Sequence, residues 1–195
     1  MNQGKRQKLI DAAVTLVARN GLSGFSVSKA AALAGTCERL VYIHFNTRED
    51  YLQACFEPIR ERWAEFLGQQ TLQTDETLLQ AMRRTWEQCF RYLISGGEET
   101  LFYLDYCDAA PGAGMSPERL AELSEVFAAI LDKLESGQEQ ELLWLHCRVT
   151  TADFVRRIIR KELPDDPKTV ESIWKLQLGG MESFLERSAV QQSAG

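Results

Sequence analysis

Side chains that can bind nucleic acid are concentrated between residues 26 and 48. Arginine and lysine bind phosphate oxygens, hydroxyl and imidazole groups donate hydrogen bonds to them, and a carboxylate can accept a hydrogen bond from a cytosine amine. The candidate DNA-contacting residues are Ser26, Lys29, Cys37, Glu38, Arg39, Tyr42, His44, Thr47 and Arg48. Such a set can read a double helix only if short, rigid elements present it to a groove.

The same stretch carries start and stop signals for two short helices joined by a tight turn. Ser26 can cap a helix whose apolar residues follow at helical spacing, and Gly35 can take the left-handed conformation that ends it. A second helix is expected over 38–44, and Thr47 then begins a longer helix with Asp50 at the third position of a capping box. The order of these signals predicts a helix-turn-helix, which places its second helix in a DNA major groove.

These residues also match the signature of a known family. The matching positions are Ile10, Ala13, Phe25, Ser26, Val27, Ala34, Gly35, Tyr42, Phe45 and Thr47. At these positions the chain resembles the TetR/AcrR family of bacterial transcriptional regulators, over about the first quarter of its length. The resemblance implies a DNA-binding domain over residues 1–47, followed by a ligand-binding and dimerisation domain over 48–195. It implies a homodimeric repressor that binds a double-stranded DNA operator and responds to a small-molecule effector.

The distribution of charge agrees with a DNA-binding N-terminus. Residues 1–52 hold seven basic and four acidic residues, a formal charge of +3, whereas the whole chain carries −6, so the remainder carries −9. A basic segment on an acidic body is the asymmetry expected of a DNA-reading head. Because the excess is small, specificity is expected to depend on a few base contacts and on dimer geometry.

The composition indicates where in the cell the protein is located and whether its cysteines are reduced. The 195 residues are 45% hydrophobic, enough for a substantial core, but contain no apolar run long enough to span a bilayer and no apolar signal segment at the N-terminus. We therefore expect a cytoplasmic protein with no membrane association. The five cysteines are an odd number, widely spaced and without a CxxC pair, which favours reduced thiols.

Beyond residue 52 the pattern is helical throughout, without strand alternation. Glycine, proline and serine clusters separate six expected helices, near 48–69, 75–94, 98–109, 117–135, 139–162 and 168–187. With three helices in the head, the sequence predicts an all-α protein of about nine helices.

The last two expected helices carry apolar stripes at spacings of three and four. These candidate dimer-interface residues are Leu142, Leu145, Val149, Ala152, Val155, Ile159, Val170, Ile173, Gln177, Met181 and Phe184. The same stripes would also arise from packing inside one subunit. Gly179 and Gly180 favour close helix approach or a kink, because glycine within a helix costs about 1 kcal/mol relative to alanine.

Aromatic residues in the middle of the chain are candidates for an effector pocket. Together with one acid they are Trp63, Phe66, Trp86, Phe90, Phe102, Tyr103, Asp105, Tyr106 and Trp144. Ordinary core packing is the competing interpretation for each of them. Asp105 and Asp108 lie among apolar and aromatic neighbours, so at least one of the two carboxylates is expected to be partly buried. A buried acid needs a partner such as Arg83, Arg84 or Arg91, or it recognises a cationic or hydrogen-bond-donating ligand.

Three other functions remain to be weighed. An enzyme is disfavoured because the chain has only two histidines, no catalytic motif, and no spacing typical of metal ligands, so no cofactor is expected. Cys37 could serve as a redox-sensitive thiol, because a helix N-terminus lowers a thiol pKa. The alternative to a DNA-binding repressor is a regulator-like dimer that acts through a protein partner, which the unusual Glu38, Leu40 and His44 motivate.

Overall fold

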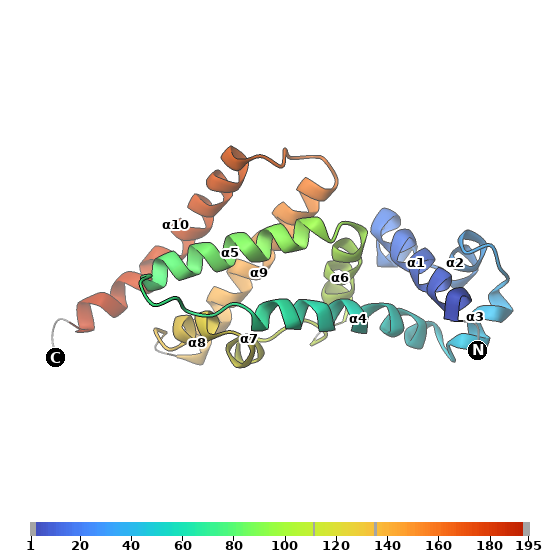
Figure 1. The fold of residues 1–195 in the computed structure, drawn as a ribbon, viewed down its shortest axis with the longest axis horizontal. Coiled ribbons are helices and arrows are strands. Elements are labelled where there is room, and N and C mark those ends of the chain that lie inside the picture. Colours follow the sequence, from blue (N-terminus) through green and yellow to red (C-terminus); the bar gives the residue numbers. More distant parts are fainter. Residues whose placement is uncertain (1–2, 111, 135, 193–195) are drawn as a thin grey trace. The chain divides into compact units, whose positions relative to one another are not determined.

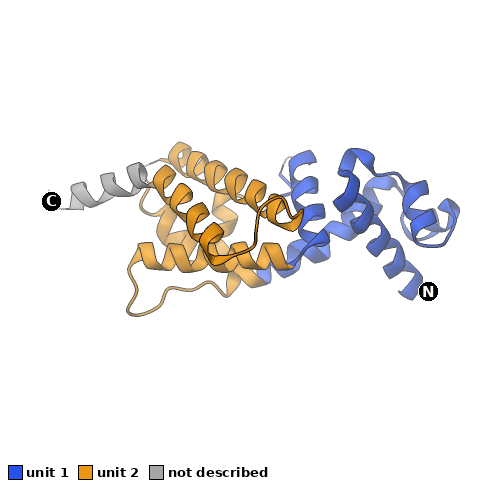
Figure 2. Cartoon of the chain, turned by 90° about the horizontal axis from the view of Figure 1, so that it is seen from above, with its two compact units in different colours: residues 1–65, 96–114 blue, residues 66–95, 115–195 orange. Residues whose placement is uncertain are grey.

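The computed structural model describes residues 3–110, 112–134 and 136–192, and for residues 182–192 it describes the backbone alone. Over these ranges the chain forms ten α-helices and one short 3-10 helix, with no strand (Figure 1). It divides into two compact units, residues 1–65 with 96–114 and residues 66–95 with 115–195, called unit 1 and unit 2 below (Figure 2). The expectation of an all-α fold with an N-terminal helix-turn-helix is confirmed.

Unit 1 is built around the first helix of the chain. It contains α1 (Gln3–Asn20), η1 (Leu22–Gly24), α2 (Val27–Leu33), α3 (Glu38–His44), most of α4 (Arg48–Gly68) and α6 (Glu98–Ala109). The buried face of α1 recurs at helical spacing and includes Leu9, Ile10, Ala13, Val14 and Val17. That face is the centre of the unit 1 core, against which α2 and α6 pack.

Helix α6 joins unit 1 although it lies far from α1 in the sequence. Glu98, in its first turn, accepts a hydrogen bond from Thr15 at 2.6 Å and pairs with Arg19 at 3.5 Å. Glu99 pairs with Arg62 of α4 at 2.5 Å. The two compact units are therefore not divided between residues 47 and 48. The expected boundary there, between a DNA-binding and a ligand-binding domain, stays a prediction about function.

Unit 2 holds the remaining helices around a separate core. These are α5 (Leu78–Ser95), α7 (Pro117–Leu123), α8 (Glu125–Leu131), α9 (Gly137–Ile159) and α10 (Pro167–Gln192), together with the end of α4. One cluster of the core is formed by Met82, Leu134, Leu143, Trp174 and Met181. Helix α9 packs against both α5 and α10, so it is the central helix of this unit.

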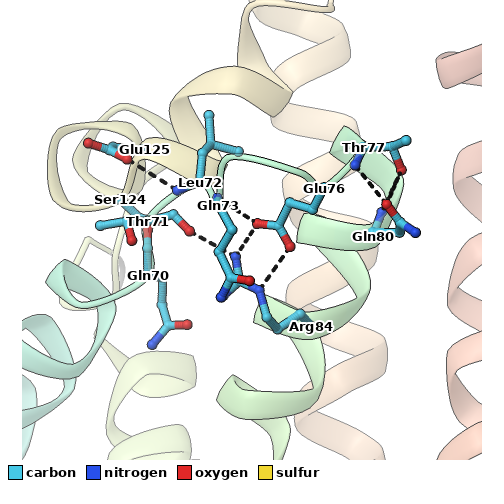
Figure 3. A network of polar contacts seen from close by, with 10 residues as sticks. All are labelled: Gln70, Thr71, Leu72, Gln73, Glu76, Thr77, Gln80, Arg84, Ser124 and Glu125. Carbon is cyan, nitrogen blue, oxygen red and sulfur yellow. Dashed lines mark hydrogen bonds and ion pairs between the residues drawn. The ribbon is translucent and has the colours of Figure 1, made fainter.

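The helix count differs from the expected nine at one place. The prediction of a single helix over 117–135 is wrong. The chain is extended at Ser124 (φ −135°, ψ 126°), between α7 and α8. The buried Ser124 hydroxyl donates a hydrogen bond at 2.7 Å to the carbonyl oxygen of Gln70, in the connection between α4 and α5 (Figure 3). This contact is distant in sequence, so helical periodicity could not predict it. Within the described ranges, no helix has the length and apolar character needed to cross a membrane.

Candidate nucleic-acid interface

The turn between α2 and α3 has the geometry that its sequence predicts. Ser26 caps α2, and its hydroxyl oxygen accepts a hydrogen bond from the Lys29 amide at 3.2 Å. Gly35 follows α2 with φ at +68°, a conformation that glycine adopts without strain. The Thr36 amide then bonds back to the Ala31 carbonyl at 2.9 Å and closes the helix end. Both expected signals, the cap and the glycine stop, are confirmed.

Helix α3 keeps one side in the core and presents the other to solvent. Val41 is 1% exposed and Phe45, directly after the helix, is also buried. Tyr42 is 46% exposed and Ile43 is 68% exposed. Glu38 and Arg39 lie one turn earlier on the same side and are exposed as well. The outward face of α3 therefore combines a carboxylate, a guanidinium, a phenol and a large aliphatic side chain.

The N-terminus of α4 is fixed by a reciprocal capping box. Thr47 accepts a hydrogen bond from the Asp50 amide at 3.0 Å, and Asp50 accepts one from the Thr47 amide at 3.2 Å. The Arg48 guanidinium lies over the Phe25 ring, 5.4 Å from its centroid, and also contacts Glu49 at 3.4 Å. These contacts hold the partly exposed Arg48 against Phe25. The capping box and the start of α4 at Arg48 confirm the expected helix start.

Tyr51 connects this corner of the site to α1. Its ring is fully buried and stacks on Phe45 with 4.4 Å between centroids, and its hydroxyl donates a hydrogen bond to the Leu9 carbonyl. Burial raises the pKa of the Tyr51 phenol well above its usual value. The neighbouring Cys55 thiol is also buried, and burial raises its pKa to about 12, so both groups are neutral at physiological pH. Tyr51 thus ties Phe45, at the end of α3, to α1.

The structure gathers the nine candidate DNA-contacting residues in the helix-turn-helix and the start of α4, all in unit 1. Six are exposed: Lys29, Cys37, Glu38, Arg39, Tyr42 and Thr47. Ser26, His44 and Arg48 are partly buried. The His44 Nδ1 atom is buried without a hydrogen-bond partner among the described residues. One exposed side chain of α3, Ile43, was not among the candidates. Its only signal in the sequence is its place next to Tyr42.

The candidate effector residues fall into both units. Trp63, Phe102, Tyr103, Asp105 and Tyr106 belong to unit 1, and Phe66, Trp86, Phe90 and Trp144 belong to unit 2. In unit 1, Phe56 stacks on Tyr103 at 5.3 Å and on Tyr106 at 4.4 Å. In unit 2, Trp86 stacks on Phe90 at 4.9 Å and lies 5.4 Å from the Trp174 ring.

The acid among these candidates and its three expected arginine partners belong to different units. Asp105 approaches the turn before α2, where a Cβ atom on Gly21 would lie 3.8 Å from its Oδ2 atom. In unit 2, Arg83 pairs with Glu171, Arg84 with Glu76 and Arg91 with Asp165. Each expected arginine thus has another carboxylate as its partner.

Unit 2 contains a groove of about 830 Å³ along α5. It is lined by Phe66, Gln69, Gln70, Gln80, Arg83, Arg84, Glu87, Gln88 and Arg91. Figure 3 shows how Arg84 ties the α4–α5 connection to α5, with hydrogen bonds to Glu76 at 2.5 Å and to the Thr71 carbonyl at 2.8 Å. The buried Gln70 side chain has its Oε1 atom without a hydrogen-bond partner within the described ranges. Gln70 thus lines the groove together with the aromatic Phe66.

The candidate dimer residues differ in burial. Leu142, Leu145 and Val149 of α9 are exposed, whereas Ala152 and Val155 are buried and Ile159 is partly buried. On α10, Val170, Ile173, Gln177 and Met181 are all buried within the subunit, and the side chain of Phe184 lies outside the described residues. Among the side chains of α10 that the structure describes, the exposed large apolar one is Leu176.

A capped helix-turn-helix with an exposed second helix defines the class of DNA-binding regulators. Residues 9–55 match the sequence model described as "Bacterial regulatory proteins, tetR family". The resemblance to the TetR/AcrR family is thereby confirmed over these residues. The chain is also 36% identical over 63 residues to the fatty acid metabolism regulator protein of Bacillus subtilis. This match spans 32% of the chain and 31% of that protein.

Solved structures share the fold over almost the whole chain. A TetR-like transcriptional regulator from Rhodococcus superposes with a TM-score of 0.64 and 18% identity, covering 97% of this chain and 98% of that one. A TetR family transcription regulator from Marinobacter aquaeolei superposes with a TM-score of 0.59 and 22% sequence identity, covering 91% of this chain and 96% of that one. The fatty acid degradation regulator FadR from Bacillus halodurans superposes with a TM-score of 0.58 and 23% sequence identity, covering 91% of this chain and 96% of that one. At these identities the likeness shows the fold alone.

Proposed function

We propose that the chain is a ligand-responsive transcriptional repressor that binds a palindromic operator as a homodimer and is released by a small apolar or aromatic effector. The observation that carries the proposal is the outward face of α3. A helix-turn-helix with Arg39, Tyr42 and Ile43 exposed on its second helix is shaped for a major groove. The basic excess of residues 1–52 supports the same function.

Dimerisation follows from the small size of the reading element. Helix α3 has seven residues, so one copy contacts few base pairs, and two-fold related copies double the contacted sequence. We propose that the pairing surface consists of Leu142, Leu145 and Val149 of α9 with Leu176 of α10. These are exposed aliphatic side chains that an isolated subunit would leave in water.

For the effector we propose a site in unit 2, with Phe66 at the groove and Trp86, Phe90 and Trp144 as neighbouring aromatic candidates. The groove combines the aromatic ring of Phe66 with amide, guanidinium and carboxylate side chains, so an effector with an apolar body and a polar group is the ligand that we propose for it. Trp63, Phe102, Tyr103, Asp105 and Tyr106 remain candidates in unit 1. Because the Bacillus subtilis relative is a fatty acid metabolism regulator, fatty acids and their derivatives belong in a first ligand screen.

Release of DNA follows from linkage between the two kinds of site. A ligand that binds better to a dimer with the wrong separation of its two α3 helices lowers DNA affinity by that difference in binding free energy. Helix α4 begins with the capped Arg48 in unit 1, and its last residues belong to unit 2. It is therefore the continuous element through which a change in unit 2 would reach the reading head.

Substitution of the exposed contacts tests the DNA-binding part of this proposal. Full-length protein is used to select duplexes from a random pool at low salt, and affinities are measured by fluorescence anisotropy at several salt concentrations. We expect Arg48→Ala to weaken binding and to reduce the slope of log K against log salt by about one, because one phosphate contact is lost. Tyr42→Ala should weaken binding, while Arg119→Ala, at an exposed arginine of unit 2, should change neither quantity.

Two results would contradict the proposal. Unchanged affinity in both head variants would remove Tyr42 and Arg48 from the interface. If the selection retains no duplex at low salt, the repressor function is lost, and the dimer that acts through a protein partner becomes the function to pursue.

A further inference from the structure

The most exposed large apolar side chains of unit 1 are confined to its helix-turn-helix. They are Leu33, Tyr42 and Ile43, which are 51%, 46% and 68% exposed, and the described remainder of the unit keeps its large apolar residues at least partly buried. Ile43 is the most exposed large apolar side chain among the described residues of the chain. An aliphatic side chain exposed on a reading surface is stabilised only by a partner that has apolar surface of its own.

The neighbours of Ile43 indicate what that partner is. Arg39 lies one turn before Ile43 on the same face of α3, and the exposed Lys29 is on α2. Residues 1–52 together carry a formal +3 charge. This charge complements a nucleic acid, so the surface fits the DNA major groove better than an apolar protein surface.

The apolar side chain of Ile43 limits which groups of DNA it can contact. Its side chain has no hydrogen-bonding atom, so it cannot bind a phosphate oxygen or the polar edge of a base. In the major groove the base edges present one methyl group, at C5 of thymine, and every other distinguishing group is a hydrogen-bond donor or acceptor. An aliphatic side chain there favours thymine over the other three bases.

We propose that Ile43 is a specificity-determining residue that reads the 5-methyl group of a thymine in each half-site of the operator. The inference rests on the proposed DNA-binding function and adds a chemical requirement to it. Each half-site must contain a thymine at the position that Ile43 reaches, and the two thymines must be related by the two-fold axis of the dimer.

Replacement of thymine by deoxyuridine tests the inference, since it removes the methyl group and leaves every hydrogen-bonding group in place. Duplexes selected by the full-length protein are resynthesised with one symmetry-related pair of thymines replaced at a time. We expect one pair at which wild-type affinity falls about fourfold for each half-site, or about fifteenfold for the pair, from the loss of one buried methyl contact per site.

The Ile43→Ala variant supplies the decisive comparison. It should bind the thymine duplex more weakly, lose the difference between thymine and deoxyuridine at that pair, and keep the wild-type salt slope because no phosphate contact is removed. Leu33→Ala is the matched control, an exposed leucine of α2 outside the reading helix, and it should keep the full difference. Because Ile43 is exposed and alanine favours helix, both variants should fold, which thermal unfolding checks.

The outcomes separate the inference from the function on which it rests. If selected duplexes contain no methyl-sensitive thymine pair, or if Ile43→Ala keeps the sensitivity, Ile43 does not read thymine, although DNA binding stands. If no duplex is retained at low salt, both the repressor function and the role of Ile43 are overturned.

Discussion

Of the three successive helices α2, α3 and α4, only α3 begins without a side-chain cap. Ser26 and Thr47 each accept a backbone hydrogen bond at the start of α2 and α4. Cys37 occupies the same position at α3 with extended backbone, but its side chain makes no capping hydrogen bond. The helix that carries the reading face therefore has the weakest local start, because thiol sulfur is a poor acceptor for a backbone amide.

A serine at this position should strengthen that start. We expect Cys37→Ser to raise the free energy of unfolding by about 0.5–1 kcal/mol and the melting temperature by about 2–4 °C, because the hydroxyl can accept a hydrogen bond from the first turn of α3. Thermal unfolding measures the change. Cys37→Ala is the control, since it removes the thiol without supplying a cap. Equal free energies of unfolding of the serine and alanine variants would show that a capping side chain at residue 37 does not stabilise α3.

At the scale of elements, the contact between α9 and α10 is close and partly polar. Gln177, which is buried, accepts a hydrogen bond from Thr150 at 2.7 Å and donates one to Thr151 at 2.7 Å. Gly180 lies against His146, where a Cβ atom would collide with the imidazole Nε2. At the adjacent Gly179, no atom of the described residues lies within 4 Å of the Cβ position. One glycine of the pair is therefore needed for packing within the subunit, and the other is not.

The two glycines should respond in opposite directions to substitution by alanine. Gly179→Ala is expected to raise the free energy of unfolding by about 0.5–1 kcal/mol, because alanine has the higher helix propensity. Gly180→Ala should lower it despite the same propensity gain, because the new methyl group collides with His146. Denaturant unfolding of the two variants beside the wild type provides the measurement. Similar effects from both would mean that His146 moves aside without cost.

The same elements show how far the sequence predicts the structure. Caps at Ser26 and at Thr47 with Asp50 could be predicted because both partners lie within three residues. The stripe on α10 could not be assigned to a partner, because a spacing of three and four serves a subunit core and a dimer interface equally. In the structure Val170, Ile173, Gln177 and Met181 are buried within the subunit. The break at Ser124 depends on a hydrogen bond to Gln70, 54 residues away in the sequence.

At the scale of the whole molecule, charge and exposed apolar surface are distributed unevenly. Unit 1 has a reading surface with Arg39, Tyr42 and Ile43 exposed, and unit 2 has exposed aliphatic residues on α9 and α10. The charge asymmetry was evident in the sequence, because it needs only a count along the chain. The placement of α6 in unit 1 was not evident in the sequence. It depends on contacts of Glu98 with Thr15 and Arg19, which lie 79 or more residues earlier in the chain.

A carboxylate at the proposed pairing surface tests whether the molecule acts as a dimer. We expect Leu145→Glu to produce a monomer, because an unpaired carboxylate buried in an apolar interface costs several kcal/mol. Leu72→Glu is the matched control, since Leu72 and Leu145 are both 44% exposed but Leu72 lies in the α4–α5 connection. Light scattering coupled to size-exclusion chromatography gives the mass of each variant. The Leu145→Glu monomer should also lose most of its operator affinity while keeping its helical circular dichroism, because a single α3 helix contacts only one half-site. A Leu145→Glu variant that remains dimeric would move the interface away from the outer face of α9.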